Sequence, residues 1–297
     1  MRRAAFVIAT LAIPVAIVIG LAFGLAACGD DGSSGPTPTQ TVTVTATPTV
    51  APTDDPSAIM TVSLYFLRGE TLGVAHRAVP ASGAPATAAM NALLAGPNKR
   101  ERAAGLTSAV PAGVDLHGVV IDSDTKVATV DLGSRFGSGG GSASMQARVA
   151  QVVYTLTQFP TVRAVRFLID GKPDVPLGGE GLLLEKPQTR AEWQELLPAI
   201  FVESPAVGDT VRSPVAVKGM AMVFEATFVL EVLSKGGDVL TRKVVMADAG
   251  APERGSFSAR LTFSGAGRNV ILRAYQESME DGSPLDEVMV PLRVAAD

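Results

Sequence analysis

The fold of the first half of this chain is decided by one stretch, ASMQARVAQVVYTLTQFP, at residues 143–160. Its apolar residues recur at the spacing of a helix with one buried face: Met145, Val149, Val152, Val153 and Leu156. We therefore predict a helix that begins near Ala143 and ends before Pro160. The glycine-rich residues 137–141 precede it and predict a loop.

Strand patterns surround this helix on both sides. A first helix is expected to open at Pro85 and to stop at Gly96-Pro97. Alternating or β-branched runs predict five strands, at residues 61–67, 73–79, 115–121, 126–132 and 162–169. The resulting order, ββαββαβ, predicts a two-layer α+β domain with its helices on one face of a mixed sheet.

The second half of the chain reads as β structure throughout. Glycine-rich turns at residues 236–238 and 265–267 separate alternating runs. We expect seven short strands, at residues 200–203, 215–219, 227–233, 239–246, 256–263, 269–276 and 287–294. Seven strands in so short a length predict an all-β, immunoglobulin-like sandwich without a disulfide.

A connector lies between these two regions. Thr189 and Glu192 have the spacing of a capping box, which predicts a short helix before Pro198. Trp193 lies on its apolar side, and we predict that it anchors one domain against the other. Trp193 is also the candidate interaction residue, because a surface-exposed tryptophan that binds a partner is the alternative interpretation.

The amino-terminal residues predict export and a lipid anchor. Arg2 and Arg3 precede an apolar run that ends at Cys28, the single cysteine of the chain. The residues LAAC at 25–28 resemble the lipobox of bacterial lipoproteins, which implies lipidation of Cys28. A membrane-spanning anchor or a free buried thiol is the alternative. Residues 1–27 are then a signal peptide, and the Thr/Pro-rich residues 28–58 are expected to form a disordered spacer.

Several stretches of the first domain also resemble a known family. They include VDL at 130–132, LLAGP at 93–97, VRFLIDG at 165–171 and, most specifically, QVVYTLTQFP at 151–160. This part of the chain is similar to the GerMN domain of bacterial sporulation and germination lipoproteins. The resemblance implies a non-enzymatic envelope domain.

The second half resembles the immunoglobulin-like domain of bacterial spore-germination proteins. The resemblance is carried by SPAVG at 204–208, SPVAVKG at 213–219 and FEA at 224–226. We therefore expect a GerMN-like α+β domain at residues 59–187, a connector helix at 188–198 and the sandwich at 199–297.

Chemistry-bearing motifs are sparse, and we predict no catalytic, cofactor or metal residues. His76 and His117 lack a metal-ligand spacing with any other candidate. The Ser123–Lys126 pair matches Ser-x-x-Lys, but its residues are expected to form a hairpin turn. Asp122 and Asp124 are read as polar turn residues in preference to a calcium site. Loop 137–141 is read as mobile in preference to an anion cradle, and residues 99–102 as an exposed charged face.

Two functions from different classes remain open. The formal net charge of -4 argues against nucleic acid as a partner. The first hypothesis is a non-catalytic scaffold on the outer face of the cell membrane, lipid-anchored and presenting faces or strand edges to an envelope protein or to peptidoglycan. The alternative is a sensor lipoprotein that binds a solute or muropeptide in a cleft between the domains, near Trp193. Neither hypothesis is an enzyme.

Overall fold

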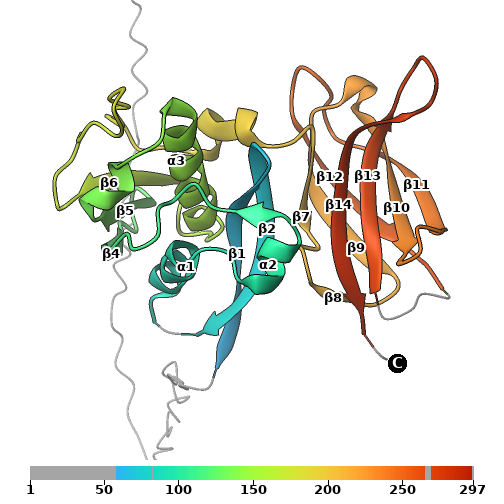
Figure 1. The fold of residues 1–297 in the computed structure, drawn as a ribbon, viewed down its shortest axis with the longest axis horizontal. Helices are drawn as coiled ribbons and strands as arrows, with labels where there is room; N and C mark the ends of the chain where they lie inside the picture. Colours follow the sequence, from blue (N-terminus) through green and yellow to red (C-terminus); the bar gives the residue numbers. More distant parts are fainter. Residues whose placement is uncertain (1–57, 82, 265–268, 296–297) are drawn as a thin grey trace, which may run out of the picture. The chain divides into compact units, whose positions relative to one another are not determined.

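The computed structural model describes residues 58–81, 83–264 and 269–295 (Figure 1). The expected signal peptide, Cys28 and the Thr/Pro-rich residues up to 57 lie outside this part, as does the turn at residues 265–267. Among the described residues, no helix combines the length and the apolar character that crossing a bilayer requires.

The first domain contains two small sheets. Strands β1 (Ile59–Arg68) and β2 (Thr71–Pro80) form a hairpin that β3 (Leu106–Thr107) extends. The second sheet has the order β4-β5-β6, built from Leu116–Ile121, Val127–Leu132 and Ala164–Ile169. The expectation of one mixed sheet is therefore wrong, although the α+β class and the five predicted strands are confirmed, and the two-residue β3 was missed.

The helix predicted from the opening stretch is α3 (Ser142–Leu156), which contacts both β1 and β6 and lies between the two sheets (Figure 1). Its face is buried against α1 (Pro85–Leu94) as well, so one apolar core serves both sheets. A short 3-10 helix, η1 (Ser134–Gly137), precedes α3.

The charged run at residues 99–102 is exposed as predicted at Lys99, Arg100 and Arg102, and the prediction is wrong only for Glu101. The run forms the short helix α2 (Lys99–Ala103), which begins at an Asn98 capping box. Glu101 is the helix's N3 residue and is only 5% exposed. It forms an ion pair with Arg77 of β2. Glu101 is buried because it pairs with an arginine of a distant strand, although the local sequence predicts that it is exposed.

Polar side chains of α3 and of the turn that follows it take the place of a neighbouring strand along β1. Gln158 bonds both backbone groups of Ser63, accepting from its N–H at 2.7 Å and donating to its carbonyl at 2.8 Å. Tyr65 lies two residues farther along β1. Its carbonyl accepts from Gln151 at 3.0 Å, and its N–H donates to the Thr155 hydroxyl at 3.3 Å. The backbone groups of Ser63 and Tyr65 at this edge of β1 are therefore satisfied by side chains and not by another strand.

The second domain is the predicted sandwich. One sheet has the order β11-β10-β13-β14-β8 and the other β12-β9-β7. The strands are β7 Ile200–Ser204, β8 Thr210–Val211, β9 Val215–Ala221, β10 Thr227–Ser234, β11 Val239–Met246, β12 Gly255–Leu261, β13 Asn269–Glu277 and β14 Pro284–Val294. All seven predicted strands are present, and only the two-residue β8 was missed.

Strand β7 belongs to both domains through the alternation of its side chains. Ile200 and Val202 pack into the sandwich core, whereas Phe201 points the other way and packs into the α/β core. Phe201 stacks on Tyr65 of β1, with ring centroids 6.2 Å apart. The two domains are thus joined by a shared apolar core and not merely by the connector.

Candidate functional site

The seam between the domains is organised by Arg190, the first residue of the connector helix η2 (Arg190–Leu196). Its guanidinium donates to Glu203 of β7 at 3.0 Å and to the Tyr65 hydroxyl at 3.1 Å. It also lies over the rings of Tyr65 and Tyr154, at 5.2 Å and 4.8 Å from their centroids. One side chain from the connector therefore binds the first domain and the second domain together.

The two tyrosines at this joint are held in their neutral form. Burial, followed by the nearby charge and hydrogen bond of Glu203, raises the pKa of Tyr65 well above its usual range, against the opposing charge of Arg190. Burial raises the pKa of Tyr154 to about 12. The hydroxyl of Tyr65 therefore remains a proton donor to Glu203 at any physiological pH.

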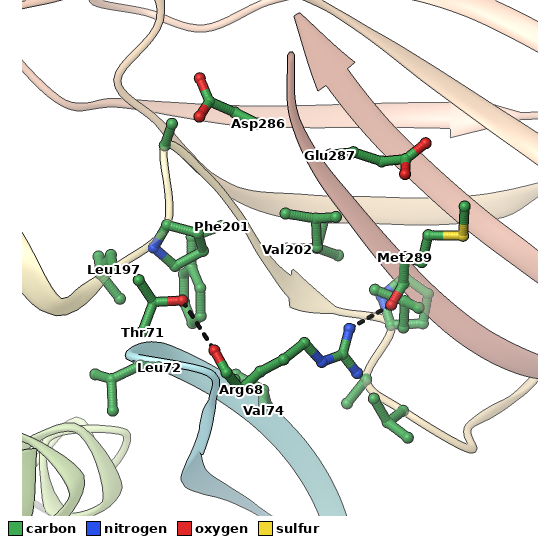
Figure 2. Close-up of a pocket in the computed structure, with 18 residues that line it drawn as sticks. Arg68, Thr71, Leu72, Val74, Leu197, Phe201, Val202, Asp286, Glu287 and Met289 are labelled. Carbon is green, nitrogen blue, oxygen red and sulfur yellow. Dashed lines mark hydrogen bonds between the residues drawn. The ribbon is translucent and has the colours of Figure 1, made fainter. Parts of the chain in front are cut away.

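A cavity of about 400 Å³ opens on the seam beside this joint (Figure 2). The β1–β2 hairpin supplies one wall with Leu72 and Val74, and β7 with the residues before it supplies a second. Strand β14 closes the far side, where Asp286 and Glu287 lie at the rim. The volume and the largely apolar walls are those of a small ligand site.

Arg68 crosses this cavity from β1 to β14. It donates to the carbonyl of Met289 (Figure 2). It also donates to the carbonyl of Ala104 at 3.3 Å. Its Nε is buried and has no hydrogen-bond partner among the described residues. Burial lowers the pKa of Arg68. Arg68 thus carries a buried donor without a hydrogen-bond partner at the wall of the cavity.

The outer edge of β2 faces the seam with unpaired backbone groups. The backbone N–H and C=O groups of Ser63 and Tyr65 point away from β2. In an antiparallel pair, the residues directly opposite them, His76 and Val74, then point their own backbone groups away from β1. The same alternation turns Leu72 outward. No described residue forms a backbone hydrogen bond with the outward groups of Leu72 or Val74.

A second cavity of about 430 Å³ lies farther along the same two strands. His76 of β2 and Arg293 of β14 line it, together with polar residues of α2. The His76 Nδ1 lies 2.7 Å from a carboxylate oxygen of Asp209, which also accepts from the Ala206 N–H at 2.8 Å. Val207 lines both cavities.

Trp193 does not line either cavity. It is 9% exposed and belongs to the α/β core, and its indole N–H has no partner among the described residues. This burial contradicts the alternative of a surface-exposed binding tryptophan. The capping box of Thr189 and Glu192 is present as predicted, but the residue that spans the two domains is Arg190. A cleft between the domains does exist, and it is not formed around Trp193.

The other candidate side chains have structural partners. Asp122 accepts from the N–H groups of Asp124 and Thr125, and these bonds lower its pKa. Ser123 and Lys126 belong to the same hairpin turn, as predicted. His117 lies 3.6 Å from Asp131 on the β4–β5 pair. The described residues contain no group of three or more His, Cys, Asp or Glu side chains placed to hold a metal ion.

The glycine-rich loop is held by a residue that sequence reasoning missed. Arg148 of α3 is 4% exposed and donates to the carbonyls of Phe136, Ser138 and Gly139 at 2.6–2.8 Å. The expected mobile loop is therefore fastened to the helix that follows it. An arginine within the apolar stretch of α3 was the signal, because a buried cation needs acceptors nearby.

The fold and the seam define the class: a two-domain protein in which an α/β domain shares a core with an immunoglobulin-like sandwich. Within this class, residues 63–175 match the family described as sporulation and spore germination. Residues 199–283 match the immunoglobulin-like domain of bacterial spore germination. The chain therefore carries a GerMN-type domain followed by an immunoglobulin-like germination domain, which confirms the resemblance seen in the sequence.

Solved structures with related folds include three bacterial ones. A candidate lipoprotein of Clostridium perfringens is 20% identical, with 47% of this chain and 93% of that chain covered and a TM-score of 0.34. The first GerMN domain of the Bacillus subtilis sporulation protein GerM is 22% identical over 44% of this chain and 98% of that chain, with a TM-score of 0.37. The tandem GerMN domains of GerM are 15% identical over 69% and 62%, with a TM-score of 0.39. No curated protein matches the chain.

Proposed function

We propose that this chain is a lipid-anchored, non-catalytic binding module of the bacterial cell envelope, which holds another envelope component during assembly or maintenance of the wall. The observation that carries the proposal is the seam: two germination-type domains share a core, and a backbone edge of β2 is left unpaired beside it. An unpaired strand edge is a ready docking surface for another chain.

Membrane attachment in this proposal rests on Cys28. Lipidation of that residue places the folded domains on the outer face of the membrane, and two or more acyl chains give lasting attachment at about 0.8 kcal/mol per buried methylene. The sequence LAAC at residues 25–28 supports this anchor.

Chemical crosslinking in cells that express the chain tests the binding role. The wild-type chain is expected to incorporate radiolabelled palmitate, to fractionate with membranes and to be crosslinked reproducibly to one envelope protein or to peptidoglycan. The Cys28→Ser variant should lose the label and the membrane fraction. Absence of any specific crosslinked component from the wild-type chain, in cells where the label is incorporated, would contradict the proposal.

A sensor of small solutes is the second candidate. The apolar cavity of about 400 Å³ on the seam favours it, because this volume suits a small ligand. A thermal-shift series with amino acids and muropeptides separates the two functions. A saturable rise in Tm of several degrees with one compound favours the sensor, whereas no rise alongside a specific crosslinked protein favours the binding module.

A further inference from the structure

We propose that the seam cavity binds an extended peptide segment of a partner protein as an added strand on the outer edge of β2, with selection for basic side chains. This inference rests on the proposed binding function and names the chemistry of its ligand. The proposed occupant of the cavity is a peptide of alternating apolar and basic residues, and not a small solute.

The first argument is the burial of the unpaired edge. Leu72 and Val74 are 1% and 4% exposed, yet their outward backbone groups have no partner among the described residues. Buried backbone N–H and C=O groups are costly unless they are hydrogen-bonded. An incoming strand supplies the N–H and C=O groups that such an edge needs, at the usual spacing of about 4.8 Å.

The second argument is the contrast with the other edge of the same hairpin. The edge of β1 is already satisfied by Gln151 and Thr155 of α3 and by Gln158, which follows the helix. Two carbonyls of β14 at the seam are also occupied, that of Met289 by Arg68 and that of Pro291 by the Gly208 N–H. The edge of β2 is thus the unfilled strand position at the cavity.

The third argument is the distribution of charge and apolar surface around the cavity. Its β7 side offers Phe201 and Val202, which suit the apolar side chains of one strand face. Across the cavity, Asp286 has no cationic partner among the described residues and accepts a bond only from Gln276, at 2.7 Å. The neighbouring Glu287 pairs with Arg273 at 2.8 Å. A basic side chain on the opposite strand face would meet Asp286.

A defined peptide tests this inference on the full chain in detergent. The probe is a fluorescein-labelled decapeptide, Lys-Val-Thr-Val-Lys-Val-Thr-Val-Lys-Thr, and binding is read by fluorescence anisotropy. We expect saturable binding, at least tenfold weaker binding of a peptide with Glu in place of every Lys, and loss of binding when alternate backbone nitrogens are methylated. Equal binding of the methylated peptide, or no binding of the first peptide, would overturn the inference.

Protein variants locate the binding to the β2 edge. Val74→Pro removes an outward N–H without breaking a bond to β1, and Val74→Ala trims the same side chain while keeping that N–H. We expect Val74→Pro to bind the peptide about tenfold more weakly than Val74→Ala, with circular dichroism confirming that both fold. Val244→Pro, at the remote edge strand β11, should leave binding unchanged. If Val74→Pro fails to fold, the methylated peptide decides the question alone.

Asp286→Asn tests the charge preference at a position with φ of 52°, a left-handed conformation that asparagine tolerates well. The preference for Lys over Glu peptides should fall at least threefold, and an unchanged preference would contradict the assigned charge role. Crosslinking with the Val74→Pro chain separates this inference from the function. An envelope component captured equally by both chains, with no peptide binding, overturns the strand site and leaves the binding module standing.

Discussion

At the scale of single residues, Arg190 has the most consequential position in this protein. It follows the predicted cap residue Thr189, so the sequence places it correctly at the start of a short helix. Nothing in the local sequence indicates that its guanidinium would reach Glu203 and Tyr65 in different domains. Its partly buried charge pair and its contacts with two aromatic rings make it a structural joint.

Replacement of this residue gives a clear prediction. Arg190→Met leaves Glu203 and the Tyr65 hydroxyl without their cation and should lower the free energy of unfolding by about 2 kcal/mol. Urea unfolding followed by circular dichroism measures the loss. The control is Lys186→Met, which removes the exposed ion pair with Glu192 and should change stability by less than about 0.5 kcal/mol. Equal effects of the two changes would show that Arg190 is not a joint.

At the scale of elements, helix α3 performs two tasks that the periodicity of its sequence shows only in part. Its apolar positions predict the buried face correctly. Its polar residues Gln151 and Thr155 also face inward, where they bond the edge of β1. A polar residue on a helix is ordinarily expected at the surface. The tertiary contact with an unpaired strand reverses that expectation.

The edge-capping role predicts an unusually large cost for a small substitution. Gln151→Glu replaces the amide that donates to the Tyr65 carbonyl with a carboxylate that cannot donate to it, in a fully buried position. We expect a loss of about 3 kcal/mol of unfolding free energy in urea titrations. Gln146→Glu, on an exposed position of the same helix, should cost less than about 0.5 kcal/mol. A cost below about 1 kcal/mol at Gln151 would refute the edge-capping role.

At the scale of the whole molecule, the two domains are coupled through strand β7. Its side chains alternate between the sandwich core and the α/β core, so the boundary predicted near residue 199 falls on a strand that both domains use. The seam cavities lie beside this shared strand and between β2 and β14. The candidate site therefore exists only when both domains are folded and joined.

The shared core predicts that one sandwich residue controls the stability of the other domain. Phe201→Ala should destabilise the chain by about 3–5 kcal/mol and should reduce hydrogen-exchange protection of amides in β1 and α3. Phe257→Ala is the matched control, because Phe257 packs on Phe228 inside the sandwich. It should reduce protection in the sandwich strands first. If Phe201→Ala spared β1 and α3, the shared core would have no energetic role.

The sequence by itself determined the elements of this protein. Helical and strand periodicity, the Thr189 capping box and the seven-strand pattern depend on residues close together in the chain, and such local patterns reveal secondary structure and both domain families. The contacts and cavities at the seam between the domains could be known only from the tertiary structure. Tyr65 bonds Glu203, 138 positions away, and Gln158 bonds the edge of β1 at Ser63, 95 positions away. Contacts of this range arise only when packing brings distant segments together, and periodicity carries no information about them.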